Sequence, residues 1–144
     1  MPKLKTGLPD INVWIALASD RHVHHEAAKK WFAEIESGGA AFCRVTQMGF
    51  LRLITNRHVM GEDVVMQKEA WQVYQNLSRD QRVTFLHEPS GIEDEWRRLT
   101  QGGSASTNTW TDAYLAAFAL TRGLKVVSFD GGFGKLPGAN AITL

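Results

Sequence analysis

Apolar residues along this chain follow two different spacings, one typical of helices and one typical of buried strands. Ala28, Trp31, Phe32 and Ile35 stand at positions i, i+3, i+4 and i+7, which predicts an amphipathic helix over His22–Glu36. Gly38-Gly39 follows and is expected to end it. The run Lys125–Phe129 is apolar on both sides, as a buried parallel strand should be. The pattern therefore indicates an α/β protein.

Applied to the rest of the chain, the same criteria predict alternating strands and helices. The further strands are one ending at Leu8-Pro9-Asp10, then Ala40–Cys43, Val83–Leu86 and Ala141–Leu144. The further helices are Ile11–Ala18, Thr46–Thr55, Asp63–Leu77, a helix opened by a Ser90-x-x-Glu93 capping box and running to Thr100, and Thr109–Arg122. This alternation favours a parallel sheet covered on both faces. No repeat or linker interrupts it, so residues 1–144 are expected to form one domain.

Composition narrows the function classes only slightly. The net charge is +1, so no overall basic field indicates nucleic acid, and an RNA-binding surface would have to be local or act through a metal. The single cysteine, Cys43, stands in an apolar run and is expected to be buried and inert. There is no signal-peptide pattern at the start and no apolar run near the about 18 residues of a membrane span. We expect a cytoplasmic protein without membrane contact.

Three aspartates carry the candidate chemistry. Asp10 ends the first strand, Asp130 follows the strand Lys125–Phe129, and Asp112 lies in the first turn of the helix Thr109–Arg122. In parallel sheets ligands bind beyond the carboxyl ends of the strands, where all three could meet. Carboxylates brought together repel one another unless a cation neutralises them. Ligands that are all oxygen select a hard ion, Mg²⁺ or Mn²⁺, which can activate water against a phosphodiester.

Each of these residues also has a local interpretation. Asp112 completes a possible capping box with Thr109, Asp130 precedes Gly131-Gly132 as a turn residue would, and Asp10 could simply cap the helix that follows it. The histidines His22, His24 and His25 do not share one helix face, so solvated or capping roles are expected for them rather than metal binding.

With these residues in view, the sequence resembles PIN-domain ribonucleases, in particular the VapC toxins of bacterial toxin–antitoxin pairs. The resemblance rests on five segments in order: residues 8–17 (LPDINVWIAL), 22–32 (from His22 to Trp31-Phe32), 43–53 (CRVTQMGFLRL), 111–119 (TDAYLAAFA) and 128–133 (SFDGGF). It implies a three-layer α/β/α fold with a central parallel sheet, Mg²⁺- or Mn²⁺-dependent cleavage of RNA, and a cognate antitoxin protein. The family's metal-site aspartates correspond to Asp10, Asp112 and Asp130, and Asn12 corresponds to a position that helps to orient the first aspartate by hydrogen bonding.

One position departs from the family pattern. Most members carry a glutamate on the helix after the second strand, where this chain has Gln47. An amide can orient a metal-bound water but adds no charge, which favours one strongly bound cation over two. Ordinary helix packing is the alternative for Gln47. Arg44 and Arg52 lie on or beside the same helix and could contact phosphate, or could be plain surface arginines.

The leading hypothesis is thus a metal-dependent endoribonuclease, the toxin of a toxin–antitoxin pair. The alternative is a non-catalytic PIN-like module that binds RNA or a protein partner. A phosphatase of similar layout is disfavoured, because Asp10-Ile11-Asn12 lacks the second aspartate that many such enzymes place there. Apolar residues of the first two helices exceed what one helix face buries, so we expect a homodimer and an antitoxin that docks near Trp14 and Trp31.

Overall fold

The computed structural model describes residues 6–103, 109–136 and 138–144, and its centre is a parallel sheet. The strands are β1 (Gly7–Pro9), β2 (Ala40–Phe42), β3 (Val83–Phe85), β4 (Lys125–Ser128) and β5 (Ala141–Thr143). Their order in the sheet is β3-β2-β1-β4-β5, and every pairing is parallel. The chain leaves β1 toward β2 on one side and returns to β4 on the other. The sheet therefore reverses its winding between β1 and β4.

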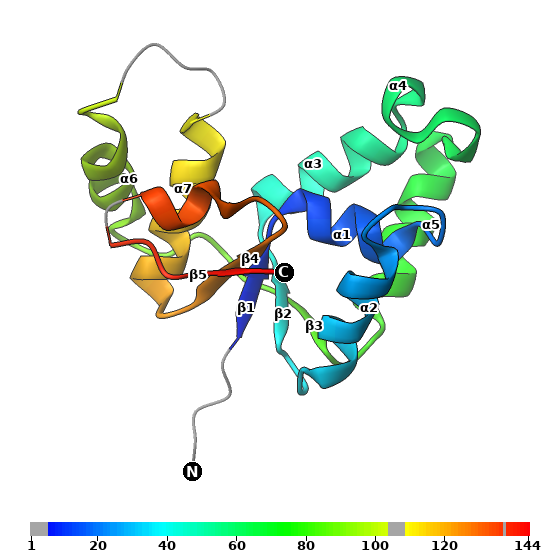
Figure 1. Cartoon of the computed structure of the whole chain (residues 1–144), viewed down its shortest axis with the longest axis horizontal. Helices are drawn as coiled ribbons and strands as arrows, with labels where there is room; N and C mark the ends of the chain where they lie inside the picture. The colour runs from blue at the N-terminus through cyan, green and yellow to red at the C-terminus, as the bar shows by residue number, and fades with distance from the viewer. Residues whose placement is uncertain (1–5, 104–108, 137) are drawn as a thin grey trace.

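Helices cover both faces of this sheet (Figure 1). They are α1 (Ile11–Ala18), α2 (His25–Glu34), α3 (Arg44–Ile54), α4 (Arg57–Met60), α5 (Gln67–Ser78), α6 (Ile92–Thr100) and α7 (Thr109–Arg122), with 3₁₀ turns η1 (Gly61–Asp63) and η2 (Gly131–Lys135). Helices α1 to α5 lie on one side of the sheet, and α6 and α7 lie on the other (Figure 1). This arrangement confirms the predicted three-layer α/β fold.

The alternation of side chains along the strands explains why two layers of helices are needed. Leu8, Ala41 and Val126 point to the face that packs against α6 and α7. Their neighbours Phe42 and Val127 point to the opposite face, toward α1, α2, α3 and α5. Both faces of each central strand are apolar, so each must be covered to remove it from water.

The helix predicted over Asp63–Leu77 begins later than expected. Residues 57–63 form α4 and η1, and α5 starts only at Gln67. Gly61 has a φ of 57°, which ends α4, and Val64 is extended with a ψ of 139°. The backbone N–H of Val65 donates to the carbonyl of Ile54 at 3.0 Å. The two valines matched a helical pattern because they are apolar, but they pack as an extended segment.

The predicted capping box at the start of α6 is wrong. The residue before the helix is Gly91, with a φ of 84°, and no side chain caps the helix there. A glycine is suited to this left-handed backbone because it has no Cβ. The helix itself lies where the sequence predicted it, and its first turn carries Glu93, which favours a helix N-terminus electrostatically.

The expectation that the first two helices expose surplus apolar side chains is also wrong for two of these residues. Trp14 is fully buried and stacks on Phe42 with ring centroids 3.7 Å apart, and Ile15 is buried as well. Helix α1 is enclosed over the run Val13–Ala16, so it behaves as a core helix rather than a surface one. Of the six apolar residues behind this expectation, only Val23 is largely exposed, at 87%; the six are Trp14, Ile15, Leu17, Val23, Trp31 and Phe32.

Two smaller expectations concern the cysteine and the membrane. Cys43 is buried at the end of β2, as predicted. Within the described residues, no helix combines the length and the apolar character that crossing a bilayer requires.

Candidate active site

Asp10 lies directly after the central strand β1 and begins α1. Its Oδ1 accepts a hydrogen bond from the backbone N–H of Ile11 at 2.8 Å, so it does cap the helix. Its Oδ2 accepts a second bond from the Ser128 hydroxyl at 3.2 Å. Burial raises the pKa of Asp10 above its ordinary value; these two hydrogen bonds oppose the rise, and the charge of Asp130 adds to it. The local role and a site role are therefore compatible, because each oxygen has a different partner.

Ser128, the last residue of β4, joins the two strands at the point where the sheet reverses. It is only 1% exposed. Its hydroxyl donates to Asp10 and accepts from the Asn12 side-chain amide at 3.2 Å and from the backbone N–H of Asp130 at 3.0 Å. Sequence reasoning assigned Ser128 no role. The available signal was a hydroxyl at the end of an otherwise apolar strand.

Asn12 orients Asp10 through Ser128 rather than directly. Its amide nitrogen donates to the serine hydroxyl, and its carbonyl oxygen lies 3.5 Å from the backbone nitrogen of Phe129. The structure therefore places Asn12 beside the first aspartate, as the sequence suggested, with one hydroxyl between them.

Asp112 reaches the same region from α7. Burial, then the charge of Asp10, then the charge of Asp130 together raise the pKa of Asp112 to about 6. The influence of both charges agrees with a position of Asp112 at the same end of the sheet as Asp10 and Asp130. Among the hydrogen bonds of the described residues, none involves the Asp112 side chain, so the expected capping box with Thr109 is absent there.

Asp130 completes the set on the other side of Ser128. Its Oδ1 accepts from the backbone N–H of Gly132 at 2.8 Å, which makes it the N-cap of η2. The turn role that the sequence allowed is thus present, and Asp130 uses only one carboxylate oxygen, Oδ1, for it. Asp10 and Asp130 flank the β1–β4 reversal, the position where open α/β sheets bind ligands.

The donor set fits a hard divalent cation in its chemistry. All of its charged groups are carboxylates; the charge of Asp130 raises the pKa of Asp10, and the charges of Asp10 and Asp130 raise that of Asp112, a repulsion that a bound cation would relieve. In the described part of the chain, however, no three acidic, histidine or cysteine side chains are already drawn together as a closed ligand set. Side-chain rotations would have to bring the carboxylates inward around an ion.

Gln47 and Arg44 lie at the N-terminal turn of α3, just beyond the carboxyl end of β2. Gln47 is 8% exposed, and its side-chain oxygen accepts a hydrogen bond from the Arg44 guanidinium. The guanidinium carbon also lies 4.9 Å from the centre of the Phe85 ring. Arg44 is therefore held at the sheet edge by a neutral amide and an aromatic ring.

Arg52 does not share this position. It is exposed two turns further along α3 and lines a hollow together with Thr55, Gln67 and Trp71. A helix rises about 12 Å over eight residues, so the two arginines are separated along α3. The structure brings Arg44, and not Arg52, to the end of the helix nearest the sheet edge.

The three histidines form no group of metal ligands in the described residues. His22 Nδ1 accepts from the backbone N–H of His24 at 3.0 Å, and His25 Nδ1 lies 2.7 Å from the carbonyl of Ala16. The ring of His24 stacks on Phe129 with centroids 4.3 Å apart. The first two contacts agree with the expected local roles, whereas the stacking next to Asp130 was not predicted.

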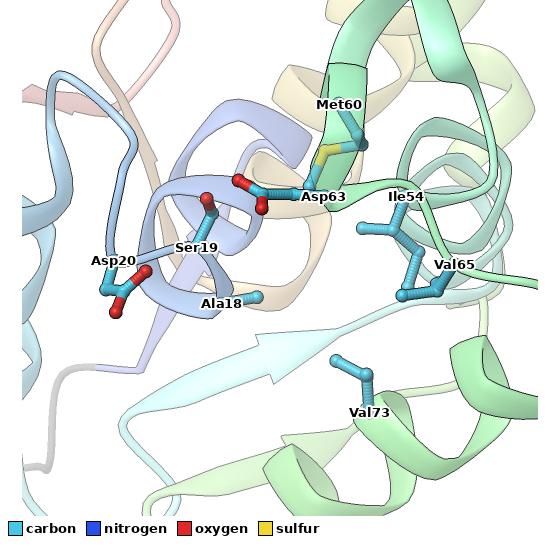
Figure 2. Close-up of a pocket in the computed structure, with 8 residues that line it drawn as sticks. All are labelled: Ala18, Ser19, Asp20, Ile54, Met60, Asp63, Val65 and Val73. Atoms are coloured by element: carbon cyan, nitrogen blue, oxygen red, sulfur yellow. The ribbon is translucent and has the colours of Figure 1, made fainter.

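A separate pocket lies at the far end of α1 (Figure 2). It has a volume of about 220 Å³ and is lined by Asp20 and Asp63 on one side and by Ile54, Val65 and Val73 on the other. Asp63 is 3.7 Å from the guanidinium of Arg21. Because α1 is eight residues long, this pocket is about 12 Å from Asp10 along the helix and is distinct from the three carboxylates.

Comparisons with known proteins cover nearly the whole chain. A family model described as the PIN domain matches residues 8–139, a range that includes all three aspartates. Ribonuclease VapC41 of Mycobacterium tuberculosis is 42% identical over 136 residues, which are 91% of this chain and 93% of that protein. Ribonuclease VapC38 of the same organism is 33% identical over 126 residues, 88% of this chain and 86% of its own length.

Solved structures agree on the fold. VapC20 of Mycobacterium tuberculosis, a Sarcin-Ricin loop cleaving toxin, superimposes with a TM-score of 0.70 at 16% identity, covering 93% of this chain and 96% of that one. VapBC2 from Rickettsia felis, bound to a DNA fragment from its promoter, gives a TM-score of 0.67 at 9% identity over 96% and 98% of the two chains. At such low identity these two likenesses concern the three-dimensional fold alone.

Proposed function

Because this chain belongs to the PIN domain family, and within it to the VapC ribonucleases, we propose that it is the toxin of a toxin–antitoxin pair and hydrolyses RNA at Asp10, Asp112 and Asp130. The observation that carries the site assignment is the Ser128 hydroxyl, which joins the Asp10 carboxylate to the backbone of Asp130 at the β1–β4 reversal. Asp112 lies close enough for the charges of both to raise its pKa. Mg²⁺ or Mn²⁺ is the proposed cofactor, since carboxylate oxygens suit small hard cations.

When bound, such a cation supplies an activated water and neutralises charge on the phosphodiester in the transition state. The protein's own part is to hold the ligands. Ser128 and Asn12 fix the orientation of Asp10 through the hydrogen bonds described above. Asp112, with a pKa of about 6, is mostly ionised at neutral pH and so is available as a charged ligand.

The neutral Gln47 does not replace the carboxylate that most of the family has at this position. It holds Arg44 at the sheet edge, where the guanidinium can bind a backbone phosphate of the RNA. We propose Arg44 as the main phosphate contact. We propose Arg52 as a second phosphate contact only for an RNA long enough to extend along α3.

A protein antitoxin is the proposed partner. Solved structural neighbours include a toxin-antitoxin complex from Klebsiella pneumoniae, with a TM-score of 0.67, and DNA-bound VapBC from Salmonella typhimurium, with a TM-score of 0.65. Self-association into a homodimer also remains part of the proposal.

Cleavage of a labelled single-stranded RNA tests the assignment. The wild-type protein should cleave it with Mn²⁺, lose this activity in EDTA, and regain it when Mn²⁺ is restored in excess. Asp10→Asn should abolish cleavage, and Ser128→Ala, which removes an outer partner of a metal ligand, should lower it about 10–100-fold. Asp20→Asn is the matched control, because Asp20 is exposed and lines the separate pocket of Figure 2; its activity should equal that of the wild type.

The alternative, a non-catalytic RNA- or partner-binding module, predicts a different pattern. RNA would bind without being cut at any Mn²⁺ concentration, and Asp10→Asn would leave that binding unchanged or stronger. Cleavage that persists in Asp10→Asn, or that survives EDTA, would show that the three aspartates are not the site.

A further inference from the structure

A groove lined by aromatic residues lies beside the three carboxylates, between α3 and the α6–α7 pair. It has a volume of about 450 Å³. We call it the aromatic groove; its lining includes Arg44, Glu88, Trp96, Trp110, Thr111 and Tyr114. Thr111 directly precedes Asp112 on α7, so the groove borders the proposed catalytic centre. None of the roles proposed so far uses its aromatic side chains.

The aromatic rings in this groove are held in place. The Trp96 indole N–H donates to the backbone carbonyl of Trp110 at 2.9 Å. The Trp96 ring meets Trp110 edge-on, with centroids 6.0 Å apart and an interplanar angle of 81°, and meets Tyr114 at 5.5 Å and 86°. The Tyr114 hydroxyl in turn donates to Glu88 at 2.7 Å. Trp110 is therefore positioned before any ligand arrives.

Trp110 is nevertheless 56% exposed. A large aromatic side chain that is both oriented and uncovered is suited to stacking against a flat ligand, because little entropy is lost on binding. Arg44, whose guanidinium is held by Gln47 and Phe85, lines the same groove. An aromatic surface and a cation, in a groove that includes the residue next to Asp112, suit the binding of an unpaired nucleotide.

We propose that the aromatic groove binds a nucleobase of the RNA next to the cleaved phosphodiester, stacked on Trp110, with a neighbouring phosphate on Arg44. This inference rests on the proposed function and deepens it by naming the groove that receives the base beside the cleaved phosphodiester. A base within a double helix is already stacked on its neighbours and cannot enter the groove. Stacking accepts any base, so the groove selects for an unpaired strand more than for a sequence.

Trp71 provides a matched comparison within the same chain. It is 50% exposed on α5 and lies beside an arginine, Arg52, in a groove of its own. That second groove contains neither a residue of the acidic site nor a neighbour of one. A general effect of removing a surface tryptophan should therefore be the same for Trp71 and Trp110, whereas an effect on bound RNA should be confined to Trp110.

The test compares Trp110→Ala, Trp110→Phe and Trp71→Ala on two substrates in Mn²⁺. One is a single-stranded RNA too short to follow α3 to Arg52, and the other is bis(p-nitrophenyl) phosphate, a phosphodiester that has no nucleobase. Trp110→Ala should lower kcat/KM on the RNA at least about 10-fold, mainly through KM, since stacking a base contributes that much in single-strand binding. Trp110→Phe should retain most of the activity, Trp71→Ala all of it, and turnover of the base-free diester should be unchanged in every variant.

Three results would overturn the proposal. One is equal RNA cleavage by Trp110→Ala and Trp71→Ala. Another is an equal loss on both substrates, which would show that Trp110 supports the catalytic centre and not a base. The third is a change in oligomeric state, measured by light scattering, that accounts for the loss of RNA cleavage, since the groove would then be a protein interface. If the wild type cleaves neither substrate, the proposed function fails; fluorescence anisotropy of the RNA on wild type and Trp110→Ala then still decides whether the groove binds it.

Discussion

At the scale of single residues, Asp112 carries much of the electrostatic cost of the site. Its pKa is raised to about 6 by burial and by the charges of Asp10 and Asp130, from an ordinary value of 3.8. The folded protein therefore binds this proton more tightly than the unfolded chain does. By linkage, the contribution of Asp112 to the free energy of unfolding falls as the pH rises from about 4 to above about 6. The raised pKa of Asp10 acts in the same direction.

Asp112→Asn should remove this penalty. In EDTA near pH 7.5, the free energy of unfolding of the variant should exceed that of the wild type by about 1 kcal/mol. This is less than the whole pKa shift of Asp112 corresponds to, because solvent screens the half-buried carboxylate. Near pH 5 the two should be closer together. Urea denaturation at both pH values measures the difference.

With Mn²⁺ bound, the order of stability of the wild type and Asp112→Asn should be reversed. Saturating Mn²⁺ should stabilise the wild type, because a ligand that binds only the folded state shifts unfolding by mass action, and Asp112→Asn should lose most of that gain. If the variant instead melts lower than the wild type in EDTA and still gains fully from Mn²⁺, Asp112 is a structural residue of α7 and not a metal ligand.

At the scale of elements, one close approach that bears on the site is at Gly7 in β1. A Cβ placed there would lie 2.8 Å from Cγ2 of Val127 and 3.4 Å from the Trp31 ring. Valine cannot rotate away easily in a strand, since both its γ-carbons are packed. Gly7→Ala should therefore force β1 from β4 and α2, and lower the free energy of unfolding by about 1–3 kcal/mol.

Because Gly7 lies three residues before Asp10, the same substitution should also weaken Mn²⁺ binding. Gly102→Ala is the control: Gly102 is exposed and a Cβ there meets nothing within 4 Å. Its urea midpoint should match the wild type. Equal midpoints for Gly7→Ala and Gly102→Ala would contradict the packing argument.

The sequence predicted elements well where one local pattern controls them. Helix α7 and helix α1 have the expected bounds, and the strands differ from the predictions by a residue or so at their ends. The errors occurred where apolar residues serve a tertiary contact instead of a periodic face. Val65 matched a helical pattern, but its backbone N–H bonds to the carbonyl of Ile54 at the end of α3. Trp14 was expected at the surface, because its burial comes from stacking on Phe42 of β2, a contact that no local pattern reveals.

The site shows the same division. Asp10 and Asp130 were predictable because strand ends in a parallel sheet meet at one edge. The hydroxyl of Ser128 that connects them, and the pairing of Arg44 with Gln47, depend on which side chains the folded chain brings face to face. No local spacing in the sequence contains that information.

At the scale of the whole molecule, the proposed toxin activity predicts an effect on living cells. Expression of this chain alone in a bacterium should arrest growth, and Asp10→Asn should lift the arrest by removing a ligand for the catalytic cation. Colony counts after induction, at matched soluble protein levels, measure the effect. Asp20→Asn should arrest growth as the wild type does. Equal growth of wild type and Asp10→Asn would remove the toxin assignment, although a metal site could survive it.

The pairing of β1 with β4 also determines at which stage of translation the proposed site can fold. Ser128 and Asp10 touch across 118 positions of sequence, and β1 meets β4 in the register Gly7 with Lys125. A ribosome must therefore translate past Ser128 before the parts of the proposed catalytic centre can be assembled. Nascent chains that stop earlier carry Asp10 without its partners, and we expect them to leave RNA intact.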